Sequence, residues 1–252
     1  SGGLIFIPLD KGLKYGKLLH EKLVENGIKA EVYESSKRRL LEKFINGEVD
    51  VLVGTVSYRS PLTRGIDLPE RIRYALFAGV PKFKIRISIE EFSPTRWLIL
   101  LNNILDVIPQ NLSRRIEYMI SRVSKLRWLR RDEIEKIRES IREGKALTGY
   151  LEYARKSVVG LIKELNEILQ LKEVLEAIRK SPTLGFGETQ DQYYFTIPDT
   201  ASYIQASGRT SRLYVGGVTL GLSVLVIDDI KAFNALKKET SIFYEDITCL
   251  LY

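Results

Sequence analysis

The stretch that decides the fold is Leu41-Glu-Lys-Phe-Ile-Asn-Gly-Glu-Val-Asp-Val-Leu-Val-Gly-Thr55. It begins inside an amphipathic segment, Lys37 to Ile45, whose apolar residues recur at helical spacing. Asn46-Gly47 then provides a glycine helix stop. The apolar run Val49 to Gly54 is typical of a strand buried on both faces of a parallel sheet. The stretch therefore predicts a helix, a tight turn and a central strand of an α/β domain.

The same alternation continues on both sides of this stretch. An apolar strand at Leu4 to Leu9 is followed by the turn Asp10-Lys-Gly12 and an amphipathic helix at Leu13 to Asn26. Further strands are expected at Lys29 to Tyr33 and Tyr74 to Gly79. Strands that alternate with helices of this length favour right-handed βαβ units and a mostly parallel sheet.

The middle of the chain has a different pattern. Apolar residues recur at helical spacing in four segments, Pro94 to Ile108, Ser113 to Val123, Arg131 to Glu143 and Leu151 to Lys180. The strand pattern resumes at Tyr193 to Ile197 and at Leu222 to Ile227. We expect an α/β domain, residues 1–88 plus 190–252, interrupted by an all-helical insertion, residues 89–189.

Composition excludes several classes of site. The chain has 252 residues and a formal net charge of +7. Its one cysteine, Cys249, rules out an intrachain disulfide framework and a cysteine zinc site, and its one histidine, His20, offers little for metal binding, so we expect no metal site in this chain. No apolar run approaches the length of a membrane span and no signal peptide is visible, so we expect a cytoplasmic protein without a membrane partner. Sparse Met and Cys with abundant Lys, Arg and Glu favour a thermophilic source.

One polar motif has the spacing of a phosphate-binding helix. Gln205, Gly208, Arg209 and Arg212 follow the pattern Q-x-x-G-R-x-x-R. On a helix Gln205, Arg209 and Arg212 share one face. Two guanidinium groups at this spacing suit a phosphoryl group whose charge grows in the transition state, the role of an arginine finger. The alternative is a pair of solvated arginines on an ordinary helix.

A second polar motif follows the predicted strand at Val49 to Gly54. Arg64-Gly-Ile-Asp67 lies in a loop that leaves the carboxyl end of this strand, where open α/β sheets bind ligands. Gly65 allows close backbone approach, and the Asp67 carboxylate can accept hydrogen bonds from a ribose. Asp67 before Leu-Pro-Glu is also a good helix cap, which is the alternative interpretation.

In residues 93–182 there are 18 Lys and Arg residues and 12 Asp and Glu residues, so most of the net positive charge lies in the middle of the chain. The stretch from Ser113 to Arg131 contains one acidic residue, Glu117, and a dense series of basic residues: Arg114, Arg115, Arg122, Lys125, Arg127, Arg130 and Arg131. Such a density attracts a polyanion, although a solvated helix face gives the same pattern. Tyr118 and Trp128 lie among these charges and can stack on bases, unless they belong to the core.

The motifs and their order resemble superfamily 2 helicases. Leu4 to Gly12, Leu41 to Thr55, Thr63-Arg-Gly-Ile-Asp67 and Gln205 to Arg212 are similar to motif IV, the strand leading to motif V, motif V and motif VI. This is the order of the second RecA-like domain, a three-layer α/β fold. The fuller wording of the last two motifs is similar to the reverse gyrase family, in which such a module is joined to a type IA topoisomerase and a helical latch lies between motifs V and VI.

The resemblance implies a role for each matching residue. Arg209 and Arg212 would reach the γ-phosphate and Gln205 would link to the nucleotide and the partner domain, as catalytic residues. Asp67, with Gly65 and Gly208, would bind the nucleotide. The DNA-binding residues would be Thr55, Thr63, Arg64 and Asp10, together with Arg127, Arg130 and Arg131 of the insertion. Thr55 and Arg64 are separated by eight residues, a longer spacing than in common helicases.

The missing motifs limit what the chain does alone. It contains no G-x-x-x-x-G-K-[ST] loop, no acidic motif suited to Mg²⁺ and no tyrosine that can be singled out as a nucleophile. We therefore expect half of an ATPase that binds ATP and Mg²⁺ only with the first RecA-like domain and that works with DNA and a topoisomerase module. The alternatives are half of a generic superfamily 2 translocase and a non-catalytic DNA-binding module. A dinucleotide oxidoreductase is disfavoured, since no G-x-G-x-x-G follows the first strand.

Overall fold

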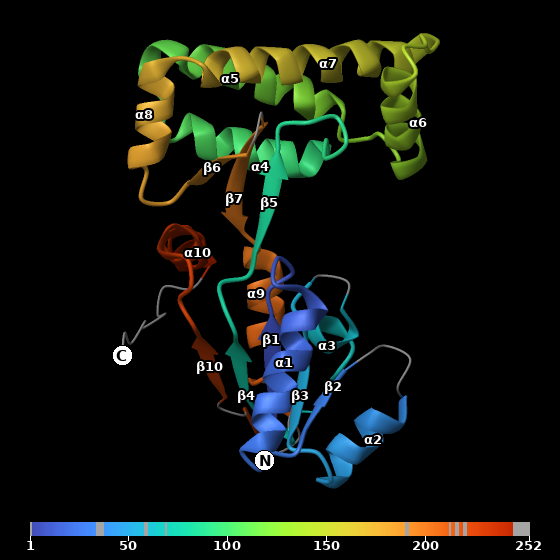
Figure 1. Ribbon diagram of the computed structural model, residues 1–252, viewed down its shortest axis with the longest axis vertical. Helices are drawn as coiled ribbons and strands as arrows, with labels where there is room; N and C mark the ends of the chain where they lie inside the picture. The colour runs from blue at the N-terminus through green and yellow to red at the C-terminus, as the bar shows by residue number, and fades with distance from the viewer. Residues whose placement is uncertain are drawn as a thin grey trace. The chain divides into compact units, whose positions relative to one another are not determined.

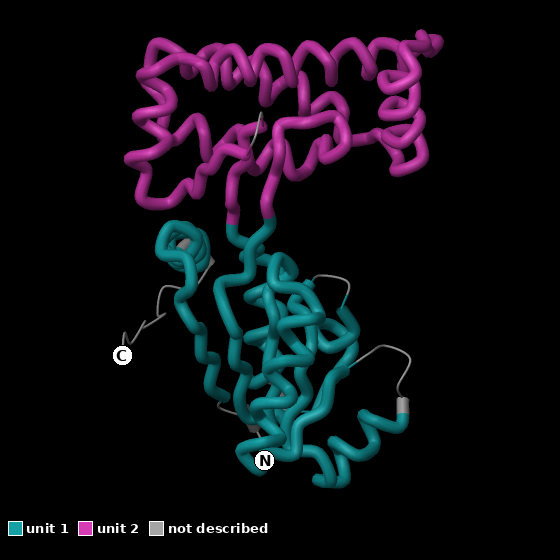
Figure 2. The backbone as a smooth tube through the Cα atoms, in the orientation of Figure 1, with its two compact units in different colours: residues 1–83, 198–252 teal, residues 84–197 magenta. Residues whose placement is uncertain are grey.

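The chain forms two compact units. The computed structural model describes residues 2–33, 38–57, 60–68, 70–189, 192–211, 213–214, 217–218 and 221–243. Unit 1 comprises residues 1–83 and 198–252, and unit 2 comprises residues 84–197 (Figure 2). The chain thus leaves unit 1 once and returns to it once.

Unit 1 is built on a five-stranded sheet with the strand order β10-β4-β1-β3-β2. Its strands are β1 Gly2–Ile7, β2 Ala30–Val32, β3 Val51–Thr55, β4 Ile72–Phe77 and β10 Leu222–Leu225. Every neighbouring pair runs parallel. Leu4 lies opposite Leu52 on one side and Ala75 on the other, and all three are fully buried. The continuous apolar runs of β1 and β3 follow from burial on both faces, and the predicted α/β class is confirmed.

Helices cover both faces of this sheet (Figure 1). Helix α1, Gly12–Glu25, packs Leu19 and Leu23 against one face. The opposite face carries three helices, α2 Arg38–Asn46, α3 Pro61–Arg64 and α9 Thr200–Ser207. Helix α10, Ile230–Phe243, packs beside α9. This three-layer arrangement is consistent with a RecA-like fold.

Unit 2 is mainly helical. Its helices are α4 Pro94–Leu105, α5 Gln110–Lys125, α6 Arg131–Arg142, α7 Gly149–Leu169 and α8 Lys172–Lys180. Each contributes buried apolar residues, and the largest fully buried side chain is Trp97 on α4. Among the described residues, no helix has the length and apolar character needed to cross a membrane.

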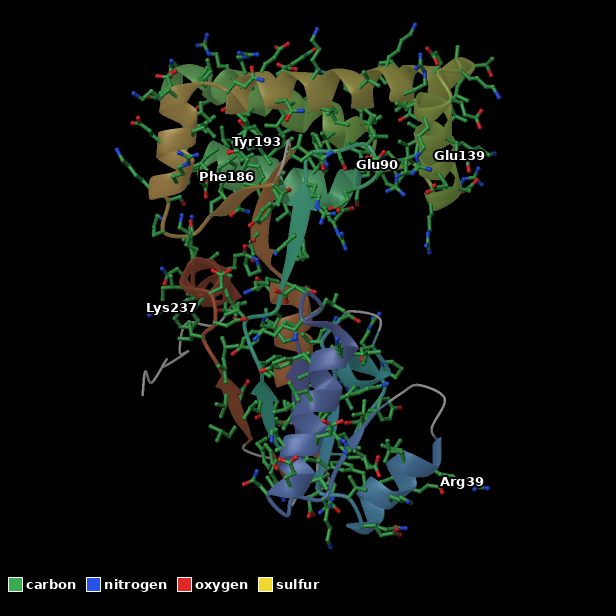
Figure 3. All side chains as sticks on the ribbon, viewed as in Figure 1. Arg39, Glu90, Glu139, Phe186, Tyr193 and Lys237 are labelled. Atoms are coloured by element: carbon green, nitrogen blue, oxygen red, sulfur yellow. The ribbon has the colours of Figure 1, made fainter. Side chains whose placement is uncertain are left out.

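Unit 2 also contains most of a three-stranded sheet with the order β5-β7-β6. The strands are β5 Lys82–Arg86, β6 Gly185–Thr189 and β7 Gln192–Pro198, and β6 and β7 are antiparallel. The strand expected at Tyr193 to Ile197 is present in β7, but it pairs with β6 instead of joining the main sheet. In the main sheet the position beside β4 is occupied by β10. Between β6 and β7, the ring centroids of Phe186 and Tyr193 are 5.4 Å apart (Figure 3). A further small ladder joins β8 Leu213–Tyr214 to β9 Gly217–Val218.

Candidate nucleotide and nucleic-acid sites

The two polar motifs of unit 1 meet through the guanidinium of Arg209. Its Nε donates to the carbonyl oxygen of Thr63 at 2.7 Å and its Nη1 donates to the carbonyl oxygen of Ile66 at 2.9 Å. Thr63 and Arg209 are 146 residues apart in the sequence. A guanidinium is planar and its donors have a fixed geometry, so two hydrogen bonds to one loop fix the position of both the loop and the arginine side chain. The structure thus brings the α3 loop and the end of α9 together.

Local sequence explains how α9 delivers Arg209 to this place. Asp199 caps the helix, since its carboxylate accepts a hydrogen bond from the N–H of Ser202 at 3.1 Å. Gly208 ends the helix, with its N–H bonded to the carbonyl oxygen of Ile204 at 3.0 Å. Arg209 follows directly, half-buried, in the turn after α9.

The α3 side of this contact depends on a close approach at Gly65. A Cβ atom at this position would lie 2.9 Å from the carbonyl oxygen of Pro61, so a larger residue would force the turn open. Asp67 follows the Ile66 carbonyl that Arg209 binds, and its side chain is exposed. The expected nucleotide residues Gly65, Asp67 and Gly208 therefore lie on the segments joined by Arg209. Arg212 lies outside the described residues.

Three oxygen atoms near this contact are buried without a hydrogen-bond partner in the described part of the chain. They are Thr63 Oγ1 on α3 and Ser202 Oγ and Gln205 Oε1 on α9. A buried polar atom without a partner costs free energy, so such atoms are uncommon in folded proteins. Ser202 was not among the residues expected from sequence, because a serine in the first turn of a helix carries no distinctive signal.

The residues expected to contact DNA in unit 1 have different environments. Thr55 ends β3 opposite Ile7 of β1, and Asp10 is exposed in the turn that follows β1, so both lie at the carboxyl edge of the sheet. Arg64 is exposed on α3. Thr63 is fully buried, so it takes part in the site through its carbonyl bond to Arg209 and not through a surface side chain.

An ion-pair network that sequence reasoning missed lies at the same edge. The Asp228 carboxylate is 2.9 Å from Lys11 Nζ and 3.4 Å from Lys82 Nζ, and Lys82 Nζ is also 3.3 Å from Asp229. Burial by itself raises the pKa of Asp228, but hydrogen bonds from the Val80 N–H and Lys11, with the charges of both lysines, lower it below its ordinary value. Both acids are thus paired with lysines. No group of three or more potential metal ligands is found among the described residues.

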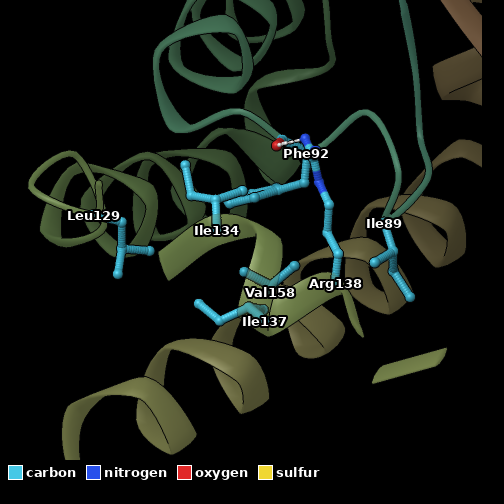
Figure 4. Close-up of a pocket in the computed structure, with 7 residues that line it drawn as sticks. All are labelled: Ile89, Phe92, Leu129, Ile134, Ile137, Arg138 and Val158. Carbon is cyan, nitrogen blue, oxygen red and sulfur yellow. Dashed lines mark hydrogen bonds between the residues drawn. The ribbon is translucent and has the colours of Figure 1, made fainter. Parts of the chain in front are cut away.

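The basic residues of unit 2 that were expected to bind DNA differ in whether they are paired with acids. Arg127 and Arg131 are exposed, whereas Arg130 is held at 3.4 Å by Glu133 and at 3.7 Å by Asp132. Trp128 is also exposed, so the alternative that it belongs to the core is wrong. A small pocket in this unit is lined mainly by apolar side chains and by Arg138, whose Nη2 donates to the Phe92 carbonyl oxygen (Figure 4). It contains none of the expected site residues and is part of the packing of the unit.

Comparisons with known proteins agree with the resemblance seen in the motifs. No family model matches the chain. The reverse gyrase of Pyrococcus horikoshii is 40% identical over 240 residues, which cover 95% of this chain and 15% of that protein. The reverse gyrase of Thermococcus kodakarensis is 42% identical over 244 residues, covering 95% of this chain and 14% of that protein, and that of Pyrococcus furiosus is 39% identical over 239 residues, covering 94% and 20%. The chain spans a fifth or less of these relatives, and over nearly all of its own length it corresponds to one segment of these reverse gyrases.

Proposed function

We propose that the chain is the second half of the ATP-dependent helicase module of a reverse gyrase, which drives positive supercoiling of DNA with a type IA topoisomerase. Unit 1 serves as the second RecA-like domain, and residues 89–189, within unit 2, serve as the latch-like insertion. ATP and Mg²⁺ bind between unit 1 and the first RecA-like domain, which supplies the phosphate-binding loop and the metal ligands. DNA crosses both domains.

The observation that carries this proposal is the joining of the two polar motifs by Arg209. Its two bonds to the Thr63 and Ile66 carbonyl oxygens fix its position beside the loop that bears Asp67. A guanidinium held in this way is preorganised, so it loses little freedom when a phosphoryl group arrives. Arg209 and Arg212 act as the arginine fingers, with Gln205 as the link to the partner domain.

The residues present fit half of a nucleotide site. The exposed Asp67 carboxylate suits the hydroxyl groups of a ribose, and Gln205 Oε1 is a buried acceptor that lacks a donor in the described structure. The sequence has no phosphate-binding loop, so these groups contact the nucleotide from one side. The chain's part in turnover is to position the γ-phosphate and to stabilise its charge.

The split site is tested by ATP hydrolysis. We expect the 252-residue chain alone to hydrolyse almost no ATP, and the longer protein that contains both RecA-like halves to be active. In the longer protein Arg209→Ala should lower kcat by about a thousandfold or more, the scale of a lost arginine finger. Appreciable hydrolysis by the chain alone would contradict the proposal.

Two control variants separate catalysis from folding. Arg209→Lys keeps the charge but loses the two-pronged bond to the loop, so its kcat should stay close to that of Arg209→Ala. Arg73→Ala removes an exposed arginine of β4 in the same unit and should leave kcat unchanged. If Arg73→Ala and Arg209→Ala lower turnover equally, the role assigned to Arg209 is wrong.

A further inference from the structure

The two tryptophans of the chain have opposite environments, and one of them is not accounted for by packing. Trp97 is fully buried in unit 2, whereas the side chain of Trp128 is 88% exposed in the turn after α5. A solvent-exposed tryptophan contributes little to a core and leaves a large apolar face in water. Such an arrangement points to a ligand that covers the ring.

Two tyrosines from a distant part of the sequence lie near the same turn. Tyr150, at the start of α7, donates its hydroxyl to the carbonyl oxygen of Lys125 at 2.8 Å, three residues before Trp128. The ring of Tyr153 stacks beside that of Tyr150 with centroids 6.0 Å apart. Tyr150 is 51% exposed and Tyr153 is 48% exposed. The hydrogen bond therefore assembles three exposed aromatic rings from two segments on one part of unit 2.

The charge around these rings is positive because the local acids are already paired. Glu152 binds Arg155 through Nε at 2.7 Å and Nη2 at 2.8 Å. These side-chain bonds, with the N–H of Leu147, lower the pKa of Glu152 to about 2. Asp132 and Glu133 are occupied by Arg130.

Three other basic residues close to Trp128 in the sequence have no such acids. Lys125, Arg127 and Arg131 are exposed and have no ion pair within the described residues. The exposed surface therefore combines free cations with aromatic rings, the combination that binds the backbone and bases of single-stranded nucleic acids.

We infer that residues 125–131 and 149–153 of unit 2 form a binding surface for single-stranded nucleic acid, with Trp128 as the platform on which an unpaired base stacks. Lys125, Arg127 and Arg131 attract the phosphates, and Tyr150 and Tyr153 extend the stacking surface. A duplex offers phosphates to the same cations but keeps its bases stacked inside, so it gains little from Trp128. This inference rests on the proposed role of DNA as a partner and specifies the strand state that unit 2 binds.

The two tryptophans supply a direct spectroscopic test with the 252-residue chain. Oligodeoxythymidylate should quench the emission of the exposed Trp128, and Trp128→Phe should abolish that quenching while the buried Trp97 still emits. In fluorescence anisotropy titrations, Trp128→Ala should weaken binding of the oligonucleotide by about tenfold, the scale of one lost base–aromatic stack. Binding of a duplex of equal length should change by less than about twofold.

Control variants keep the outcomes distinct. Leu171→Ala, at an exposed apolar residue after α7, should alter neither affinity. Charge reversal by Arg127→Glu and Arg131→Glu should weaken single-strand and duplex binding together and reduce the dependence on salt. Because Trp128 contributes almost no buried surface, its substitution should leave the fold unchanged. Circular dichroism of each variant checks this.

Three results would overturn the inference. Equal weakening of single-strand and duplex binding by Trp128→Ala, or no weakening, removes the stacking role while leaving DNA as a partner. Failure of the unchanged chain to bind either nucleic acid removes the proposed DNA partnership as well. Quenching of Trp128 by the remainder of the longer protein without nucleic acid assigns the surface to a protein contact. The ATPase effect of Arg209→Ala is independent of all three.

Discussion

At the scale of single residues, arginines bonded to main-chain carbonyl groups fix the geometry of unit 1. Arg209 joins the end of α9 to the α3 loop, and Arg71 binds α2 and the segment before β3. Arg71 Nε donates to the Phe44 carbonyl oxygen at 2.8 Å and Nη2 donates to the Val49 carbonyl oxygen at 2.9 Å. Each arginine therefore acts as a clip that holds two segments together.

Removal of the Arg71 clip should destabilise unit 1. Arg71→Ala leaves two carbonyl groups without their charged donor and removes the stacking of the guanidinium over Phe44 at 5.1 Å. The side chain is 18% exposed, so we expect a loss of about 2–3 kcal/mol in the free energy of unfolding, measured by urea titration. The exposed neighbour Arg73→Ala should change it by less than about 0.5 kcal/mol. Similar effects of the two substitutions would contradict the importance of the carbonyl bonds.

The Asp228 network makes a prediction about acid stability. Because the folded pKa of Asp228 is lowered, its contribution to stability is present above the ordinary pKa of a carboxyl group, about 4. That contribution is lost as the pH falls through the lower folded pKa. Asp228→Asn should therefore be less stable than the unchanged chain at neutral pH, and the difference should shrink below about pH 4. Urea unfolding from neutral to acidic pH measures this, and a difference that grows on acidification would refute it.

At the scale of helices and strands, the sequence predicts those elements that are determined by residues close together in the chain. The apolar runs of β1, β3 and β4 predict buried strands. The observed ends differ from the predicted ones by a few residues, since β3 is Val51–Thr55 and the prediction was Val49 to Gly54. Glycine turns and the helical spacing of apolar residues likewise predict α1, α2 and most of the helices in unit 2, whereas α3 and α10 were not expected.

The sequence fails where the cause is a distant partner. β5 and β6 were not expected, because their pairing with β7 depends on contacts far away in the chain. The two motifs of the candidate site were identified from their side chains, but their union through Arg209 was not predictable, since its acceptors are main-chain carbonyls that every residue has. Tyr150 beside the turn of Trp128 is a third case, because its acceptor is the carbonyl of Lys125.

At the scale of the whole molecule, unit 2 is inserted between two neighbouring points of unit 1. The N–H of Asp199 donates to the carbonyl oxygen of Pro81 at 2.8 Å, so the outgoing and returning segments are hydrogen-bonded. Lys82 is held by Asp228 and Asp229, and the Thr200 hydroxyl donates to Glu239 of α10. Both segments are therefore anchored in unit 1 by its own residues.

This anchoring predicts that unit 1 folds without unit 2. Replacement of residues 84–197 by a short Gly-Ser turn should leave a cooperative unfolding transition, because the ends to be joined already lie together. Thermal unfolding followed by circular dichroism, with hydrogen exchange of the β1, β3 and β4 amides, measures it. Loss of the cooperative transition, with unprotected amides in these strands, would show that the sheet requires the insertion.

The paired exit and return at Pro81 and Asp199 also has a mechanical consequence. Residues 84–197 are joined covalently to unit 1 through these two hydrogen-bonded backbone segments, so a force applied to them is carried along both. One segment leads back to β4 and the other leads forward to α9, and Arg209 lies in the turn after α9. A load on these residues is thereby carried along a covalent route to the turn in which the Arg209 guanidinium is bonded to the α3 loop.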